Sequence, residues 1–85
     1  MKKIIVEGQP NDCLAIAALL CDYSSCERLS DSNYIFIYPD KDSALKSLIY
    51  VWNKIKDISD EADGLSENKN ILIYKHCNAY IDCNF

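Results

Sequence analysis

The sequence has only two glycines and two prolines in 85 residues, and it contains no long apolar run. Because 49% of its residues are hydrophobic, the chain is not of the disordered or low-complexity kind. The longest apolar run, from Cys13 to Cys21, is much shorter than the about 20 residues that span a bilayer. Lys2 and Lys3 are not followed by the apolar segment of a secretory signal, so we expect a cytoplasmic protein.

Positive charge is also scarce and scattered. Nine Lys and Arg stand against thirteen Asp and Glu, which gives a net charge of −4, and only Lys2 and Lys3 are adjacent. Nucleic-acid and anionic-membrane surfaces need clustered cations. The composition therefore argues against both kinds of partner.

Five cysteines is an odd number, whereas a secreted disulfide framework needs an even one. We therefore expect free thiols that pack as small hydrophobic side chains. Zinc is argued against by strand parity among Cys21, Cys26, His76, Cys77 and Cys83: His76 and Cys77 point to opposite faces of a strand, so at most one of them can join a cluster easily. No metal and no cofactor is predicted.

The patterns predict one domain over residues 1–85, with the order strand, helix, strand, strand, helix, strand. This order is typical of a ferredoxin-like βαββαβ sandwich, an α+β fold with two helices on one face of an antiparallel sheet. Residues 26–29 and 34–38 would form a central hairpin, but the first of these segments has poor strand propensity. A small three-layer α/β unit, which lacks that strand, is therefore the alternative. The elements are expected at residues 3–7, from Pro10, 26–29, 34–38, from Asp40 to Ala62, and 70–84.

Two details of the chain bear on this prediction. Asp40 is a good N-cap for the second helix, and Gly64 is a natural residue just beyond its end. Residues 70–84 form either one long strand or two short ones that turn near Cys77 and Asn78, with an extra C-terminal strand in the second case.

Strand alternation divides the side chains between two sheet faces. Ile35, Ile37, Ile71 and Ile73 suit the face that the helices cover. The opposite face would then carry a large aromatic surface, which a monomer rarely leaves bare. We expect this partner-binding face to consist of Tyr34, Phe36, Tyr38, Leu72, Tyr74 and Tyr80.

Three kinds of partner fit such a face: a second copy of the chain, another protein, or single-stranded nucleic acid stacked on the rings. The acidic charge disfavours the third, an RNA-recognition-like binder. Between residues 57 and 67 the chain has five acids and no base, a patch that can complement a basic partner. The acidic residues expected to take part in binding are Asp57, Asp60, Glu61 and Asp63.

Catalysis is not predicted. Cys13 lies near a helix start, and His76 is the only histidine, but the expected topology puts these residues at opposite ends of the sheet. We therefore predict a small non-enzymatic protein-interaction module, such as a regulator, an assembly subunit or an inhibitor from a mobile element or phage. A thiol or zinc protein is a further, weaker alternative.

Overall fold

The computed structural model describes residues 2–58, 62–65 and 71–82. Side chains of residues 57, 58 and 62–65 are not described. The elements are β1 (Lys2–Gly8), α1 (Pro10–Leu19), β2 (Ser25–Ser30), β3 (Asn33–Tyr38), α2 (Lys41–Ile58), β4 (Ala62–Leu65), β5 (Ile71–Tyr74) and β6 (Cys77–Asp82).

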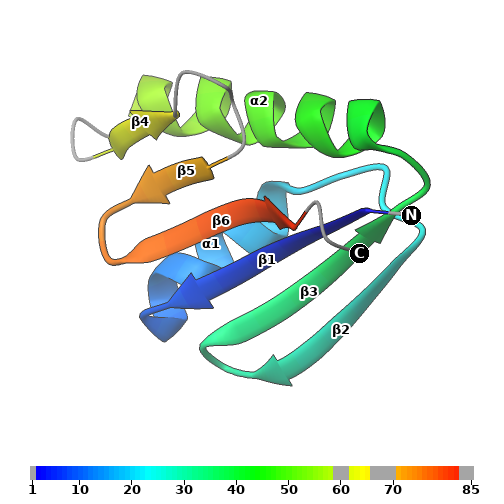
Figure 1. The fold of residues 1–85 in the computed structure, drawn as a ribbon. Coiled ribbons are helices and arrows are strands. Elements are labelled where there is room, and N and C mark those ends of the chain that lie inside the picture. The colour runs from blue at the N-terminus through cyan, green and yellow to red at the C-terminus, as the bar shows by residue number, and fades with distance from the viewer. Residues whose placement is uncertain (1, 59–61, 66–70, 83–85) are drawn as a thin grey trace.

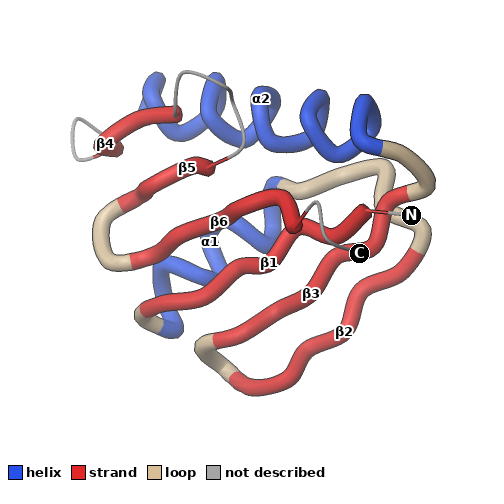
Figure 2. Tube along the Cα trace, viewed as in Figure 1, coloured by secondary structure: helices blue, strands red, loops and turns tan. Residues whose placement is uncertain are grey.

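The strands form one antiparallel sheet in the order β2-β3-β1-β6-β5-β4. Both helices pack on the same face: α1 lies behind β1 and β6 in Figure 1, and α2 runs along the top of the view. Figure 2 shows the short loops that join β2 to β3 and β5 to β6 as hairpins. The predicted α+β class is confirmed. Neither described helix is long and apolar enough to cross a membrane.

The two helices begin where the sequence predicts. Pro10 is the first residue of α1. Proline has no backbone N–H, and none is needed there, because an N–H at the first helical position has no acceptor inside the helix. Asp40 caps α2, because its Oδ1 accepts a 2.8 Å hydrogen bond from the backbone N–H of Ser43. Ala44, Leu48, Val51 and Ile55, which recur at helical spacing along α2, are buried.

The predicted end of α2 is wrong. The helix ends at Ile58, and the segment Ala62–Leu65, which the prediction gave to the helix and its terminator, pairs as β4 with β5. Asp and Gly are poor helix formers, and a cluster of acids is unfavourable at a helix C-terminus. Strand pairing therefore satisfies the backbone of this segment better than further helical turns do.

The C-terminal segment forms a hairpin, the second of the two predicted alternatives. Its turn is at Lys75 and His76, two residues earlier than expected, and Tyr74 pairs directly with Cys77. Lys75 has a φ of +53°, the left-handed conformation that two-residue hairpin turns use. This turn reverses the parity of the segment: even residues of β5 face the core, whereas odd residues of β6 do.

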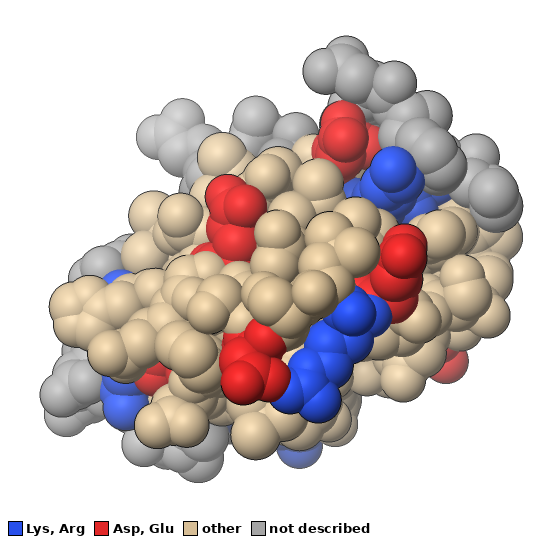
Figure 3. Space-filling model, turned by 90° about the horizontal axis from the view of Figure 1, so that it is seen from below, with Lys and Arg blue, Asp and Glu red and all other residues tan. Residues whose placement is uncertain are grey.

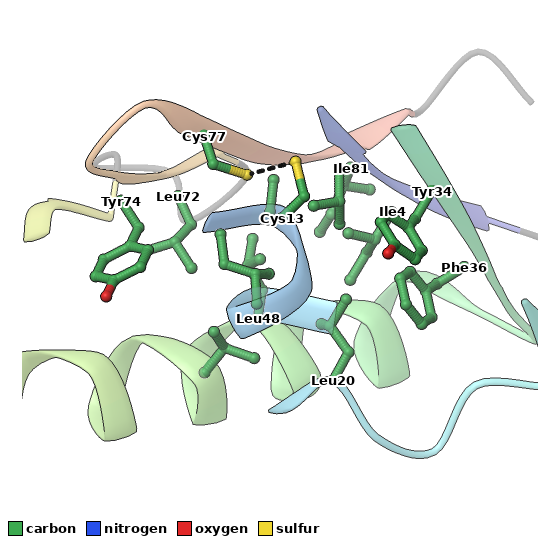
Figure 4. Packing of buried hydrophobic residues seen from close by; sticks show 14 of the residues in the cluster. Ile4, Cys13, Leu20, Tyr34, Phe36, Leu48, Leu72, Tyr74, Cys77 and Ile81 are labelled. Carbon is green, nitrogen blue, oxygen red and sulfur yellow. Dashed lines mark hydrogen bonds between the residues drawn. The ribbon is translucent and has the colours of Figure 1, made fainter. Parts of the chain in front are cut away.

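The prediction of which sheet face is covered is wrong for β3 and β5. The helices cover Tyr34, Phe36 and Tyr38 of β3, which are 7%, 2% and 0% exposed, and they also cover Leu72 and Tyr74 of β5. Figure 4 shows Tyr34, Phe36, Leu72 and Tyr74 pointing from the sheet toward the helices. On these two strands the isoleucines lie on the opposite face, where the aromatic residues were expected: Ile35, Ile37, Ile71 and Ile73.

Hydrogen bonding and ring packing explain this inversion. The Tyr38 hydroxyl donates a 2.7 Å hydrogen bond to Oγ of Ser47, a buried residue of α2, so the phenol is buried with a partner. Burial raises the pKa of Tyr38 to about 12. The ring of Phe36 lies edge-on to Tyr23 at 5.0 Å between centroids and stacks with Tyr34 at 6.3 Å. Large rings thus fill the layer between sheet and helices.

Candidate functional site: the open face of the sheet

The face of the sheet opposite both helices, which we call the open face, carries an apolar row across four strands. Ile5 of β1 is directly opposite Ile35 of β3 on one side and Tyr80 of β6 on the other. Tyr80 in turn is opposite Ile71 of β5. We call Ile35, Ile5, Tyr80 and Ile71 the central row. Side chains of directly opposite residues are about 5 Å apart, so the row is continuous.

The central row is partly accessible to solvent. Ile71 is 44% exposed, and Ile5, Ile35 and Tyr80 are half-buried because their neighbours in the row shield one another. Ile73 extends the apolar surface on β5 and is 38% exposed. A run of large apolar side chains across a sheet is typical of a surface that another molecule covers.

Polar and charged side chains border the central row along the strands. Lys3 and Asp82 are opposite one another on one side of the row, and Glu7 and Asn78 on the other. Desolvation raises the pKa of the Tyr80 phenol, and the neighbouring charge of Glu7 raises it further, so the phenol stays neutral at physiological pH. An apolar centre with a polar rim is the usual composition of a protein contact.

Charge of a single sign does not gather on the side of the molecule seen in Figure 3. Acidic and basic side chains lie beside one another there, and most of that surface is uncharged. Arg28, on the edge strand β2, forms an ion pair with Asp31. Nucleic-acid binding would require several cations close together.

Only one of the six aromatic and apolar residues predicted for the binding face lies on the open face. That residue is Tyr80, and the other five are buried between the sheet and the helices. The stacking surface on which the nucleic-acid alternative depended is thus part of the core. The predicted acidic residues are assigned to neither face. Asp60 and Glu61 lie outside the described residues, and the side chains of Asp57 and Asp63 are not described.

The prediction missed Ile5 and assigned Ile35 and Ile71 to the core. Alternation alone could not decide between the faces, because both faces of β3 and β5 are apolar. The position of the second hairpin turn is the one signal that could have done so. With the turn at residues 75 and 76, the apolar odd positions of β6 require the even positions of β5 on the same face.

At one end of the sheet, the β1–α1, β2–β3 and β5–β6 connections meet around two buried thiols. Sγ of Cys13 in α1 and Sγ of Cys77 in β6 lie 3.3 Å apart, as the dashed line in Figure 4 shows, and the two residues are 0% and 2% exposed. The Cys13 thiol also donates to the carbonyl oxygen of Ser32 in the β2–β3 turn, at 3.6 Å.

The same junction corrects the predicted position of His76. Its backbone N–H donates to Oδ2 of Asp12 at 3.2 Å, and its carbonyl oxygen accepts from the N–H of Gln9 at 3.0 Å. His76 therefore lies beside the start of α1, because β6, which begins just after it, is the strand that pairs with β1.

Gly8 makes this close approach of β1 to the β5–β6 turn feasible. Its φ is +143°, and a Cβ at this position would lie 2.2 Å from the carbonyl oxygen of His76. A side chain is therefore excluded by both conformation and space.

The thiol pair is not arranged for nucleophilic catalysis. Desolvation raises the pKa of Cys13, and it raises that of Cys77 well above the ordinary range, with the nearby Cys13 thiol adding to the effect. Reactive cysteines have a lowered pKa and partial exposure. Both thiols are protonated at neutral pH and act as packing groups.

A hollow of about 290 Å³ on the surface between α1 and the β2–β3 hairpin is lined by Pro10, Asn11, Leu14, Arg28, Asp31 and Tyr34. Arg28 and Asp31, the charged residues among these six, pair with each other. Within the part of the chain that the structure describes, no three His, Cys, Asp or Glu residues are grouped so that they could hold a metal ion.

Comparison of the chain with protein families, with curated proteins and with solved structures found no match.

Proposed function

We propose that the domain is a non-enzymatic protein-contact module that acts through the open face of its sheet. The observation that supports this function is the central row, four large side chains in register across β3, β1, β6 and β5. Burying such a row contributes roughly 25 cal/mol for each Å² of apolar surface removed from water. A module of this kind would serve as a regulator, an assembly subunit or an inhibitor.

We also propose that the fold is a ferredoxin-like sandwich with an added hairpin. Four of the strands follow the βαββαβ order, in which β6, the last strand, lies beside β1. Strands β4 and β5 are then an addition between α2 and β6. The acidic stretch around Asp57 remains a sequence-based proposal for the electrostatic part of the contact.

The test is a pair of matched substitutions. Ile35→Asp places a charge in the central row, and Leu14→Asp places the same charge on the exposed side of α1, where Leu14 is 58% exposed. A tagged domain is incubated with an untagged copy in nuclease-treated lysate of the native host, and retained proteins are identified by mass spectrometry. Before this comparison, circular dichroism must show that both variants are folded.

We expect a protein, whether the untagged copy or another chain, to be retained by the wild type and by Leu14→Asp but lost with Ile35→Asp. Retention of no protein, or of the same proteins by all three forms, would contradict the proposed function.

A further inference from the structure

We propose that the open face binds a second copy of this chain, in a symmetric dimer whose two-fold axis runs along the central row. This inference rests on the proposed function and specifies both the partner and its orientation. In the dimer two sheets pack face to face, and the central row of one copy lies on that of the other, with Ile5 meeting Ile5.

The orientation follows from two charges on β1. Lys3 and Glu7 lie on the same face as Ile5, each two residues from it, which corresponds to about 7 Å along the strand. A two-fold axis through Ile5 and perpendicular to β1 exchanges the two ends of the strand. Each Lys3 is then placed over Glu7 of the second copy, and the symmetry produces this pairing twice.

The other ways of packing two such sheets are unfavourable for the same charges. An axis parallel to β1 would place Lys3 over Lys3 and Glu7 over Glu7, and like charges that face each other in an interface are destabilising. Orthogonal packing would turn β1 across the central row of the second copy and bury its charges against isoleucine. Asp82 lies opposite Lys3 within each copy in every arrangement. Aligned sheets, with the axis along the central row, are the arrangement that also places Lys3 of one copy over Glu7 of the other.

Side chains on the neighbouring strands are compatible with this axis. On β6 it places the carboxylate of Asp82 over Asn78 of the second copy, whose amide can donate a hydrogen bond. On β3 it places Ile37 over Asn33, which adds apolar contact. Glu27 faces Glu27 at the edge strand β2, where the side chain is exposed and salt screens the repulsion.

Charge exchange at two positions tests this dimer by sedimentation equilibrium from low micromolar to millimolar concentration at low ionic strength. We expect the wild type to dimerise, and Lys3→Glu and Glu7→Lys each to weaken dimerisation by about tenfold or more, because each variant places like charges together. Lys41→Glu is the matched control for Lys3→Glu. It makes the same change of charge on an exposed residue of α2, away from the open face.

Mixtures of variants distinguish this orientation from a general effect of net charge. An equimolar mixture of Lys3→Glu and Glu7→Lys should form a heterodimer, since every Glu of one variant then faces a Lys of the other. The double variant Lys3→Glu with Glu7→Lys should regain the homodimer, yet it should bind the wild type poorly, because that mixed pair again brings like charges together. Circular dichroism confirms that each variant is folded.

Three results would overturn the dimer. One is a wild-type dimer that both single substitutions leave unchanged, and another is a mixture of the two variants that remains monomeric. The third is a wild type that is monomeric at every concentration. If this monomer still retains another protein through Ile35, the proposed function stands with a different partner; if it retains none, both fail.

Discussion

The hydroxyl of Tyr38 donates a 2.7 Å hydrogen bond to Oγ of Ser47 inside the core, so that β3 and α2 are joined by a polar contact between two buried side chains. Ser47 Oγ also accepts a 3.0 Å hydrogen bond from the backbone N–H of Cys21, which follows α1. This serine of α2 thus connects the sheet with the segment that follows α1, and it accounts for a tyrosine at a fully buried position.

Ser47→Ala should therefore destabilise the fold more than Tyr38→Phe does. The first leaves the buried Tyr38 hydroxyl and the partly buried N–H of Cys21 without an acceptor, and it is expected to cost about 2 kcal/mol of unfolding free energy. The second removes one donor and is expected to cost about 1 kcal/mol. Urea unfolding followed by circular dichroism measures both. A larger loss for Tyr38→Phe would show that Ser47 does not have this double role.

Gly8→Ala should lower the free energy of unfolding by about 3 kcal/mol, because it combines a strained backbone conformation with a collision against the β5–β6 turn. Gln9→Ala, at the next and exposed position, keeps the N–H that bonds to His76 and should change it by less than about 0.5 kcal/mol. Thermal unfolding of the two variants compares them directly. Equal stability would mean that β1 and the turn are farther apart than described.

Cys26 should react with iodoacetamide much faster than Cys13 and Cys77 at pH 8, since Cys26 is exposed and the other two are buried. Peptide mass spectrometry after timed labelling gives the separate rates. Adding denaturant should remove the difference. Rapid labelling of Cys77 in the native protein would contradict its burial.

Alkaline pH should destabilise the fold through the same thiols. The pKa of each is raised above the ordinary value of 9.0 in the folded protein. Their contribution to stability is therefore fully present below about pH 9, and it is lost as the pH rises toward the folded-state values, because the unfolded thiols ionise first. Replacing both with alanine should flatten the decline in melting temperature above pH 9. An unchanged decline would assign it to other groups.

Local signals in the sequence were sufficient to predict the class of fold. The Pro10 and Asp40 helix starts and the central hairpin could be predicted, because each depends on residues close together in the chain. The C-terminal hairpin was one of two alternatives for residues 70–84. The choice of covered face could not, because Ile35 and Phe36 are both apolar and alternation is symmetric. That choice depends on long-range facts, such as Ser47 reaching Tyr38 and the turn at Lys75.

The assignment of residues to the candidate site depends on the same choice of sheet face. Tyr80 was predicted correctly to lie on the open face, since the parity of β6 had been assigned correctly, and the five residues of β3 and β5 were assigned to the wrong face together. A shift of one residue in a strand moves every side chain to the other side of the sheet. The central row depends on the register of β1 with β3 and β6, which joins residues far apart in the chain and is not specified by local patterns.

The most direct measurement of the central claim compares Phe36→Asp with Ile35→Asp, neighbours on opposite faces of β3, by thermal unfolding at low protein concentration. Phe36 is 2% exposed, so the account predicts that its replacement by Asp buries an unpaired charge and abolishes cooperative unfolding. Ile35→Asp should retain a cooperative transition, with loss of binding only. A folded Phe36→Asp protein beside an unfolded Ile35→Asp protein would show that the sheet faces the other way.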